Sequence, residues 1–265
     1  MRKPFTEHDF FPDSAGVGQC ATVPFPFRPT RVMKIELCGE QLELLAERAL
    51  WWPAQSALLV ADAHVGKGSS FRALGVPVPD GSSSDTLARL AALLHRTGAR
   101  RLVFLGDLLH ARNGCTPALM AQLAALHRDG CDWLLVRGNH DAHAGIPQGL
   151  PLSVVDEGWR IGPFALCHHP EPVAGAYVLA GHVHPAVRIE AAGDRLRLPC
   201  FALGQDVGLL PAFGSFTGHA TLEHDGTTRL YACAGDHVFE VPATPPRRRG
   251  NGMRPRPPRA ETRFP

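Results

Sequence analysis

The chain has 265 residues, 45% of them hydrophobic, which is enough to bury one substantial core with at most a small appendage. No apolar run approaches the roughly 20 residues of a membrane-spanning helix, and the first residues lack the apolar stretch of a secretory signal peptide. The net charge is +2, but residues 243–265 carry +6, from seven arginines and one glutamate. That leaves about −4 for the rest, which is not the footprint of a basic nucleic-acid-binding surface.

The sequence predicts one domain with an extension at each end. Residues 1–32 are rich in proline, glycine and phenylalanine without periodicity, a pattern that allows disorder. Alternating apolar residues begin at Met33, which is an alternative initiator to Met1, so we expect the folded catalytic domain over residues 33–242. Residues 243–265 are rich in arginine and proline and contain few apolar residues, which predicts a disordered tail.

Five short apolar runs, each bounded by turn or helix signals, are expected to form buried strands. They cover residues 56–64, 101–110, 132–141, 164–169 and 176–184. Two helical patterns separate the first three runs. The first helix is expected to begin with Ser84 or Asp85 as its N-cap, and the second with Thr116 as N-cap and Pro117 at the first helical position. Their expected C-terminal stops are Gly98 and Gly130.

Strands that alternate with helices indicate β-α-β units and a largely parallel sheet in the first part of the domain. The later segments 194–203, 218–224 and 228–241 alternate with short turns and are expected to be antiparallel. The predicted fold is therefore α/β, with two packed mixed β-sheets flanked by helices. In open sheets of this class, ligands gather beyond the carboxyl ends of the strands.

All five expected strands end in residue types that bind metals. The endings are Asp62/His64, Asp107/His110, Asn139/His140/Asp141, His168/His169 and His182/His184. Strand ends brought to one edge of a sheet would place these side chains around a single point. A mixed set of nitrogen and oxygen donors suits Mn²⁺, Fe or Zn²⁺, whereas Mg²⁺ and Ca²⁺ prefer oxygen alone.

Each motif also has a plain structural explanation when it is taken alone. Gly-Asp commonly makes a turn, and two histidines in "GHVH" suit the surface of an edge strand. The "GKGSS" that follows His64 suggests a phosphate-binding loop, but that template requires glycine where Ala61 stands and serine or threonine where Gly68 stands. We therefore expect only a turn there. Five metal-binding endings in succession favour a metal site over five independent coincidences.

The motifs D-x-H, G-D-x-x-H, G-N-H-D, a strand-end histidine and G-H-x-H, in this order, resemble those of the calcineurin-like metallophosphoesterase superfamily. The likeness spans residues 56–184. Finer similarity over residues 34–225, including "GHVHPAV" and "LLPAFGSFTGH", resembles the bacterial ligase-associated DNA-damage-response endonuclease branch (PdeM-type). Many relatives have glycine after the strand-end histidine, whereas this chain has "HHP". His168 and His169 are thus both candidates, and we favour His168 because it comes first after the apolar strand.

The resemblance implies two divalent metal ions, Mn²⁺ first, with Fe or Zn²⁺ as alternatives, bridged by one carboxylate. The first ion would take Asp62, His64, Asp107 and His184, and the second would take Asp107, Asn139, His168 and His182. The implied reaction is hydrolysis of a phosphodiester by hydroxide generated between the two ions.

Three further side chains remain outside the implied metal ligands. His140 is expected to protonate the leaving oxygen, with Asp141 either orienting its ring or capping the loop. His110 is a candidate substrate contact, with a local hydrogen bond as the alternative.

Metal motifs alone do not select the substrate, because the chemistry at phosphorus is similar for monoesters and diesters. The subfamily resemblance implies a DNA endonuclease that acts in DNA repair beside a DNA ligase and a helicase. A phosphatase or cyclic-nucleotide phosphodiesterase acting on small molecules is the main alternative. A non-catalytic scaffold is the third, although all seven ligand positions hold competent residues. The arginine-rich tail either adds affinity for phosphate backbones or is only a solvated extension. The seven cysteines are scattered without a CxxC pair, which favours a reducing cytoplasm.

Overall fold

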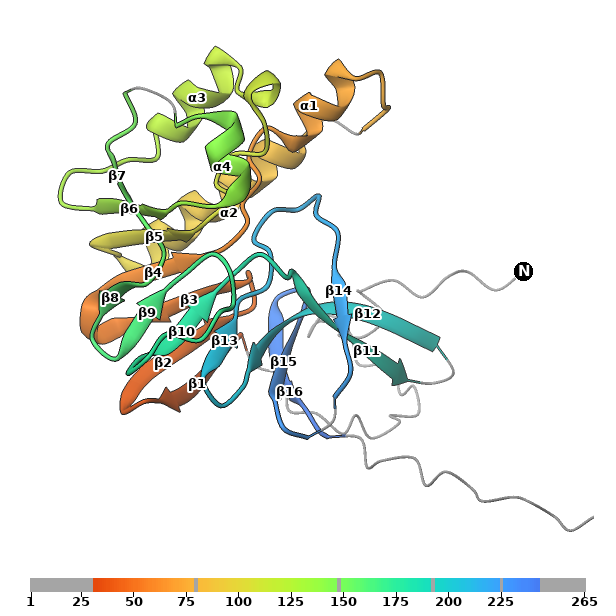
Figure 1. Ribbon diagram of the computed structural model, residues 1–265. Helices are drawn as coiled ribbons and strands as arrows, with labels where there is room; N and C mark the ends of the chain where they lie inside the picture. The colour runs from red at the N-terminus through yellow and green to blue at the C-terminus, as the bar shows by residue number, and fades with distance from the viewer. Residues whose placement is uncertain (1–30, 79–80, 147–148, 192–193, 225, 244–265) are drawn as a thin grey trace, which may run out of the picture.

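The computed structural model describes residues 31–78, 81–146, 149–191, 194–224 and 226–243. The predictions for residues 1–32 and 243–265 fall almost wholly outside these ranges. Within them, two β-sheets pack face to face, and the helices gather on one side of the first sheet, as Figure 1 shows. The α/β fold with two packed mixed sheets is thereby confirmed. None of the described helices is both long and apolar enough to cross a membrane.

The first sheet contains seven strands in chain order. They are β1 (Val32–Leu37), β2 (Glu40–Leu45), β3 (Ala49–Trp52), β4 (Ala57–Val60), β5 (Arg101–Leu105), β6 (Asp132–Val136) and β7 (Leu152–Val155). Strands β1 to β4 pair antiparallel, and β4 to β7 pair parallel. The parallel half is the part predicted from alternating strands and helices, and it brings the carboxyl ends of β4, β5 and β6 to one edge.

Four α-helices lie in the described residues: α1 (Lys67–Ala73), α2 (Ser82–Thr97), α3 (Pro117–Ala124) and α4 (Asn139–Ala144). The caps Thr116 and Gly98 are as predicted: Leu119 N–H donates to Thr116 Oγ1, and Gly98 has a φ of 62°. The N-cap predicted at Ser84 or Asp85 is wrong, because the Asp85 N–H already donates to Gly81 O and the helix begins at Ser82 with Gly81 as its N-cap.

Three further boundaries differ from the sequence prediction. Helix α1 begins at Lys67, where only a turn was expected, because Ser70 N–H donates to Gly66 O and closes a helical turn. Helix α3 ends at Ala124, well before Gly130, and the chain continues in short turns. Helix α4 occupies the segment after β6 that was expected to be strand and loop.

The second sheet contains nine strands. They are β8 (Trp159–Ile161), β9 (Phe164–Leu166), β10 (Tyr177–Ala180), β11 (Pro185–Ala191), β12 (Asp194–Leu203), β13 (Val207–Leu209), β14 (Ala220–Leu222), β15 (Arg229–Ala234) and β16 (His237–Val241). Strands β12, β15 and β16 pair antiparallel, as predicted. Strand β14 was predicted to be antiparallel but pairs parallel with β11, because a long connection after β13 returns the chain to the same end of the sheet.

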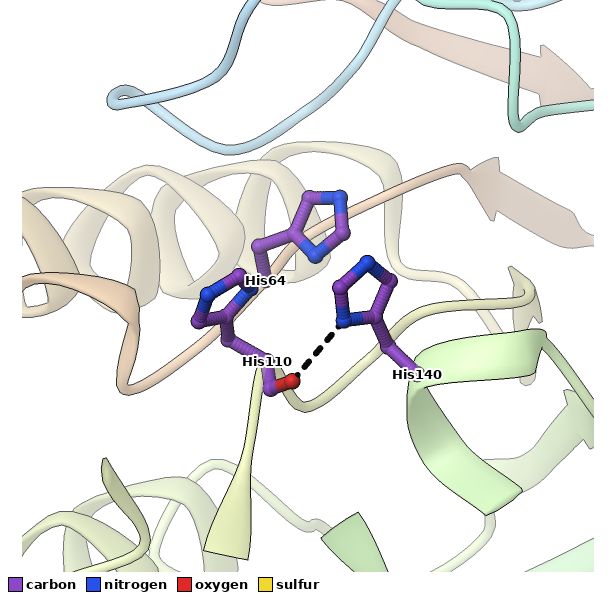
Figure 2. A group of neighbouring side chains, drawn as sticks. All are labelled: His64, His110 and His140. Atoms are coloured by element: carbon purple, nitrogen blue, oxygen red, sulfur yellow. Dashed lines mark hydrogen bonds between the residues drawn. The ribbon is translucent and has the colours of Figure 1, made fainter. Parts of the chain in front are cut away.

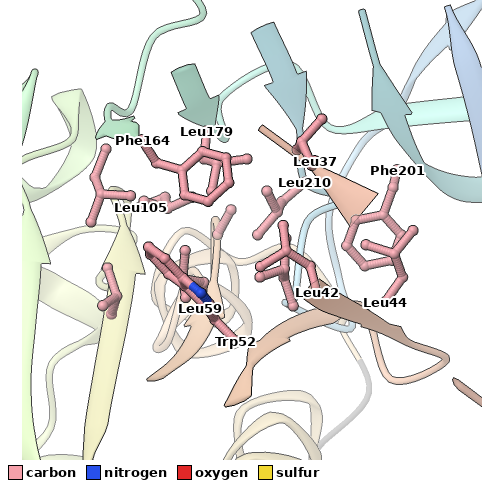
Figure 3. Close-up of a cluster of buried hydrophobic side chains, with 14 of the residues drawn as sticks. Leu37, Leu42, Leu44, Trp52, Leu59, Leu105, Phe164, Leu179, Phe201 and Leu210 are labelled. Atoms are coloured by element: carbon pink, nitrogen blue, oxygen red, sulfur yellow. The ribbon is translucent and has the colours of Figure 1, made fainter. Parts of the chain in front are cut away.

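The core between the two sheets fixes how their edges meet. Figure 3 shows the buried side chains that fill it, with Trp52 from the first sheet packed edge-to-face on Phe164 from the second, at a centroid distance of 5.0 Å. At the carboxyl edge, the backbone itself joins the two sheets, since Phe213 N–H donates to Ala61 O over 2.8 Å. The strand ends that carry the metal-binding residue types therefore face one another.

Candidate metal centre

The backbone is strained at the predicted ligands. The residues with left-handed φ angles include Asp62 (51°), His64 (44°), Asp107 (51°), His182 (65°) and His184 (52°). Side chains with a Cβ avoid this region, and such residues persist only where the surrounding structure holds them. Turning the backbone sharply at the ends of β4, β5 and β10 lets successive side chains point into one space. Strain at five predicted ligands makes this edge a candidate functional site.

The glycines of the G-D, G-N and G-H motifs leave room for the polar side chains. A Cβ on Gly106 would lie 2.1 Å from His168 Nδ1, one on Gly138 would lie 2.3 Å from an Asp107 oxygen, and one on Gly181 would lie 2.6 Å from an Asp62 oxygen. No side chain, not even that of alanine, fits at these three positions. Each motif's glycine thus makes space for a residue supplied by another motif.

Asp62 and Asp107 are buried, and each has one oxygen held by a backbone amide. Asp62 Oδ2 accepts from His182 N–H at 2.8 Å, and Asp107 Oδ1 accepts from His140 N–H at 2.9 Å. The second oxygens face the histidines: Asp62 Oδ1 lies 3.4 Å from His184 Nε2, and Asp107 Oδ2 lies 3.5 Å from His168 Nε2. Fixed carboxylates with one free oxygen each are suited to bind cations.

Backbone carbonyls orient two of the histidine rings. His184 Nδ1 lies 2.9 Å from Gly218 O, and His168 Nδ1 lies 3.1 Å from Leu105 O. A ring that donates through Nδ1 presents an unprotonated Nε2, which is the arrangement that metal-bound histidines use. In both residues Nε2 points into the centre: that of His184 lies 3.3 Å from His64 Nε2, and that of His168 lies 2.9 Å from Asn139 Oδ1.

The donor set fits divalent metal ions. Asp62 Oδ1 and His64 Nδ1 are buried and have no hydrogen-bond partner among the described residues, and an unsatisfied buried carboxylate oxygen is costly without a cation. Burial lowers the pKa of His64 to about 2, so its ring is neutral at pH 7 and keeps a lone pair for a metal. In several overlapping groups of three residues, each residue offers one ligand atom and these atoms lie within 4.8 Å of one another; Asp62/His64/His184 and Asp62/Asp107/His168 are among them.

The structure separates the two candidate histidines of "HHP". His168 is fully buried and contacts Asn139, Asp107 and His182, the last through His182 Nδ1 at 3.1 Å from His168 Nε2. His169 lies farther out, where its Nδ1 is 2.6 Å from Glu157 Oε1 and its side chain is 39% exposed. The preferred candidate from the sequence, His168, is the one placed inside the cluster.

His140 and His110 stand side by side next to His64, as Figure 2 shows. Their rings stack with a centroid distance of 4.9 Å, and His140 Nδ1 donates to His110 O at 3.0 Å. His140 Nε2 lies 4.0 Å from Asp107 Oδ2. Burial lowers the pKa of His110 to about 4, so its ring is neutral at pH 7.

The Asp141 carboxylate bonds to backbone amides and not to the His140 ring, which it was expected to orient. Its two oxygens accept from Leu109 N–H and Gly138 N–H, both at 3.1 Å. This is the capping alternative for Asp141, and the contact that orients the His140 ring comes from the His110 carbonyl instead. Burial raises the pKa of Asp141 to about 6, because the loss of hydration outweighs the hydrogen bonds from these amides, and the charge of Asp107 adds to the rise.

Sequence patterns could not identify the groups that orient the rings. The Leu105, His110 and Gly218 contributions are backbone carbonyls, which every residue possesses, so no residue type signals them. Glu157, which holds His169, comes from the turn before β8 and carries no motif. These contacts depend on which loops the fold brings together.

Solved structures similar to this chain include a nuclease and a phosphoesterase. The nuclease MPE of Pseudomonas putida shares 42% sequence identity with it at a TM-score of 0.71, over 79% of this chain and all of that one. The Escherichia coli phosphoesterase Yfce shares 16% identity (TM-score 0.38; 71% and 99% of the two chains), and a Vps29 double mutant from Entamoeba histolytica shares 18% (TM-score 0.29; 70% and 96%). Comparisons with protein-family models and with curated proteins give no match.

Proposed function

The chain belongs to the calcineurin-like metallophosphoesterase superfamily and is a metal-dependent phosphoester hydrolase, and we propose that it is an endonuclease that cleaves DNA phosphodiester bonds with two divalent metal ions. The observation that carries the proposal is the pair of buried aspartates, each with one oxygen fixed by a backbone amide and the other facing an imidazole nitrogen. Such a site supplies negative charge and nitrogen donors together, which suits Mn²⁺, Fe or Zn²⁺, with Mn²⁺ as our first choice.

Seven side chains would hold the ions. One ion would take Asp62, His64, Asp107 and His184, and the other would take Asp107, Asn139, His168 and His182. A place for Asp107 in both sets is supported by the position of its Oδ2, which lies 3.9 Å from His64 Nε2 of the first set and 3.5 Å from His168 Nε2 of the second. When bound, two such ions polarise the phosphate and lower the pKa of a shared water.

His140 would protonate the leaving oxygen. Its Nδ1 donates to the His110 carbonyl, so a proton on Nε2 is the one that the ring can transfer. With the Asp107 oxygen 4.0 Å from Nε2, the ring lies beside the proposed ions without being held by a carboxylate. Asp141 would act as a positioning residue, because its bonds to Gly138 and Leu109 fix the loop that carries His140.

The similarity to the nuclease of Pseudomonas putida supports a nucleic acid as the substrate. The resemblance of this chain to the ligase-associated branch extends the proposal to DNA repair beside a DNA ligase and a helicase. All six cysteines in the described part of the chain are free thiols, which supports a reducing cytoplasmic location.

Nicking of covalently closed supercoiled plasmid with added Mn²⁺ tests the proposal, with Asp107→Asn as the control protein. A closed circle has no ends, so nicking that disappears in the variant would establish metal-dependent endonuclease activity. If the plasmid stays closed while a simple aryl phosphodiester is hydrolysed, the metal chemistry stands and DNA is not the substrate. A wild-type protein that binds no divalent ion would overturn the metal centre itself.

A further inference from the structure

An apolar groove of about 320 Å³ opens beside the candidate metal centre. Lys67 and Phe71 of α1 line one side, Val76 and Val78 follow from the next turn, and the segment 216–218 lines the other side. Phe216 is 43% exposed and Val76 is 46% exposed. Exposed apolar side chains that gather in one concave place mark a binding surface.

A row of rings connects this groove to the proposed leaving-group acid. From the groove inward, Phe216 packs against Phe71 at a centroid distance of 5.9 Å, and Phe71 lies 5.8 Å from His110. His110 in turn stacks on His140 at 4.9 Å. Because His140 faces the leaving oxygen in the proposed reaction, the group attached to that oxygen would extend along this row into the groove.

Lys67 adds a positive charge where the groove meets the centre. Its Nζ lies 5.9 Å from the centre of the Phe71 ring, and its charge interacts with those of Asp107 and Asp62. An ammonium group at this position can contact a phosphate that lies between the metal ions and the groove. An apolar slot with one cation at its inner end is complementary to a nucleotide, whose flat base is joined to a charged phosphate.

The loop that carries Phe216 is held firmly from two sides. On one side, the Arg89 guanidinium donates to Phe213 O and lies 4.4 Å over the Phe213 ring, while Ser215 N–H donates to Thr86 Oγ1 at 3.4 Å. On the other side, a Cβ on Gly214 would lie 2.7 Å from Ala63 O, so the loop packs directly on the backbone beside the centre.

The same loop orients a proposed metal ligand. Gly218 O, two residues beyond Phe216, accepts from His184 Nδ1 at 2.9 Å. A hydrogen bond thus joins the groove wall to the candidate metal centre, so a ring bound against Phe216 would have a defined place relative to the phosphate. Fixed placement of this kind is what substrate positioning requires.

We propose that this groove binds the nucleobase on the leaving-oxygen side of the scissile phosphate, stacked on the Phe216 ring and walled by the Phe71 ring, which lies at 85° to that of Phe216, while Lys67 contacts the phosphate. The inference rests on the proposed function, since it requires a nucleic-acid substrate. The groove is apolar apart from Lys67, so it recognises a base as a flat ring and not by its hydrogen-bonding edge. Stacking on aromatic side chains is tolerant of sequence because every base has a π-face. Cleavage should thus depend on the presence of a base there more than on its identity.

A short single-stranded oligonucleotide with one phosphodiester, the other linkages being methylphosphonates, tests the proposal with added Mn²⁺. Versions that lack the base on either side of that linkage are compared with the intact one, and the products show which side carries the leaving oxygen. Removing the leaving-side base should lower kcat/KM of the wild type about tenfold, the scale of one stacking contact. Removing the other base should have a smaller effect.

The Phe216→Leu variant separates stacking from simple apolar contact. On the intact oligonucleotide it should lose most of the factor that base removal costs the wild type, and base removal should then cause only a small further loss, from the remaining contact with Phe71. Phe216→Trp should restore both the rate and the dependence on the base. Losses that multiply, with base removal as harmful in Phe216→Leu as in the wild type, would overturn the proposal. Phe71→Leu provides the same comparison if Phe216→Leu does not fold.

Trp159→Leu is the matched control. The exposed fraction of Trp159 on β8, 48%, is similar to the 43% of Phe216, but Trp159 does not line this groove. Its variant should keep the wild-type rates and the dependence on the base. Hydrolysis of methyl 4-nitrophenyl phosphate by the wild type separates the two levels of inference. Hydrolysis of that ester without cleavage of the oligonucleotide would overturn the nucleobase site and leave the metal centre standing. Failure to hydrolyse either would overturn the proposed function as well.

Discussion

Replacing Gly106 with alanine should disable the centre through a steric clash. Gly106 has a φ of 77°, which costs an alanine about 1 kcal/mol. Its new Cβ would lie 2.1 Å from His168 Nδ1 and 2.8 Å from His168 Cβ, so the whole ring must move. Overpacking of this kind adds about 1–3 kcal/mol. We therefore expect the free energy of unfolding to fall by about 2–4 kcal/mol.

The displaced ring would also lose its hydrogen bond to Leu105 O and its contact with Asn139. A displacement of about 1 Å costs on the order of 100-fold in rate, so phosphodiester hydrolysis should fall by at least that factor, together with metal content.

Gly98→Ala is the control for this experiment. Gly98 also has a left-handed φ, 62°, but nothing lies within 4 Å of the Cβ that alanine would add. It should therefore lose about 1 kcal/mol from the backbone alone and keep full activity. Urea unfolding, metal analysis and hydrolysis of an aryl phosphodiester measure the two variants in parallel. If Gly106→Ala keeps the metal content and activity of Gly98→Ala, the argument that His168 occupies a space only glycine leaves open is refuted.

Three further predictions concern the histidines. His140→Asn should lower turnover by about 10²- to 10⁴-fold without changing metal content, and a loss of metal instead would show that His140 is a ligand. His168→Asn should lose metal and activity while His169→Asn keeps both, because His169 pairs with Glu157 near the surface; equal losses in the two variants would contradict the assignment. Burial lowers the pKa of His64 to about 2, so below pH 6.5 the unfolded chain binds a proton that the folded chain does not. When the pH falls from 6.5 to 5, the metal-free wild type should therefore lose about 2 kcal/mol more stability than metal-free His64→Asn, as measured by urea unfolding. Identical pH dependence in the two proteins would contradict the burial of a neutral ring.

The candidate ligands read from the sequence lie close together because the fold converts strand ends into neighbours. Asp62 and Asp107 are 45 positions apart, yet β4 and β5 pair in parallel and deliver both to one edge. The apolar runs and helix caps that set this pairing are local features, readable without a structure. The same reasoning placed His168 ahead of His169, because a buried strand leads directly into the first of them.

Local patterns fail where one loop meets another. Asp141 follows His140 directly, so sequence proximity suggested a contact between their side chains, whereas the turn into α4 directs Asp141 toward the amides of Leu109 and Gly138. The glycines around Lys67 indicated a turn, and α1 forms there because its first turn packs against the loop at Gly114. Both outcomes depend on packing partners that are distant in the chain.

The hydrogen bonds of the two buried aspartates explain how the strained backbone at the centre persists. Left-handed residues other than glycine cost of order 1 kcal/mol or more each and survive only where neighbouring structure fixes them. Asp62 accepts from the amide of His182, which is itself left-handed, and the left-handed Asp107 accepts from the amide of His140 in α4, so hydrogen bonds between motifs hold the strained residues in place. The cluster can therefore form only when all of its loops are in place. Since metal ions would bind the remaining oxygens of the same two carboxylates, metal binding and the closing of these loops would be one coupled equilibrium, and the proposed ions would then stabilise this edge as well as supply its chemistry.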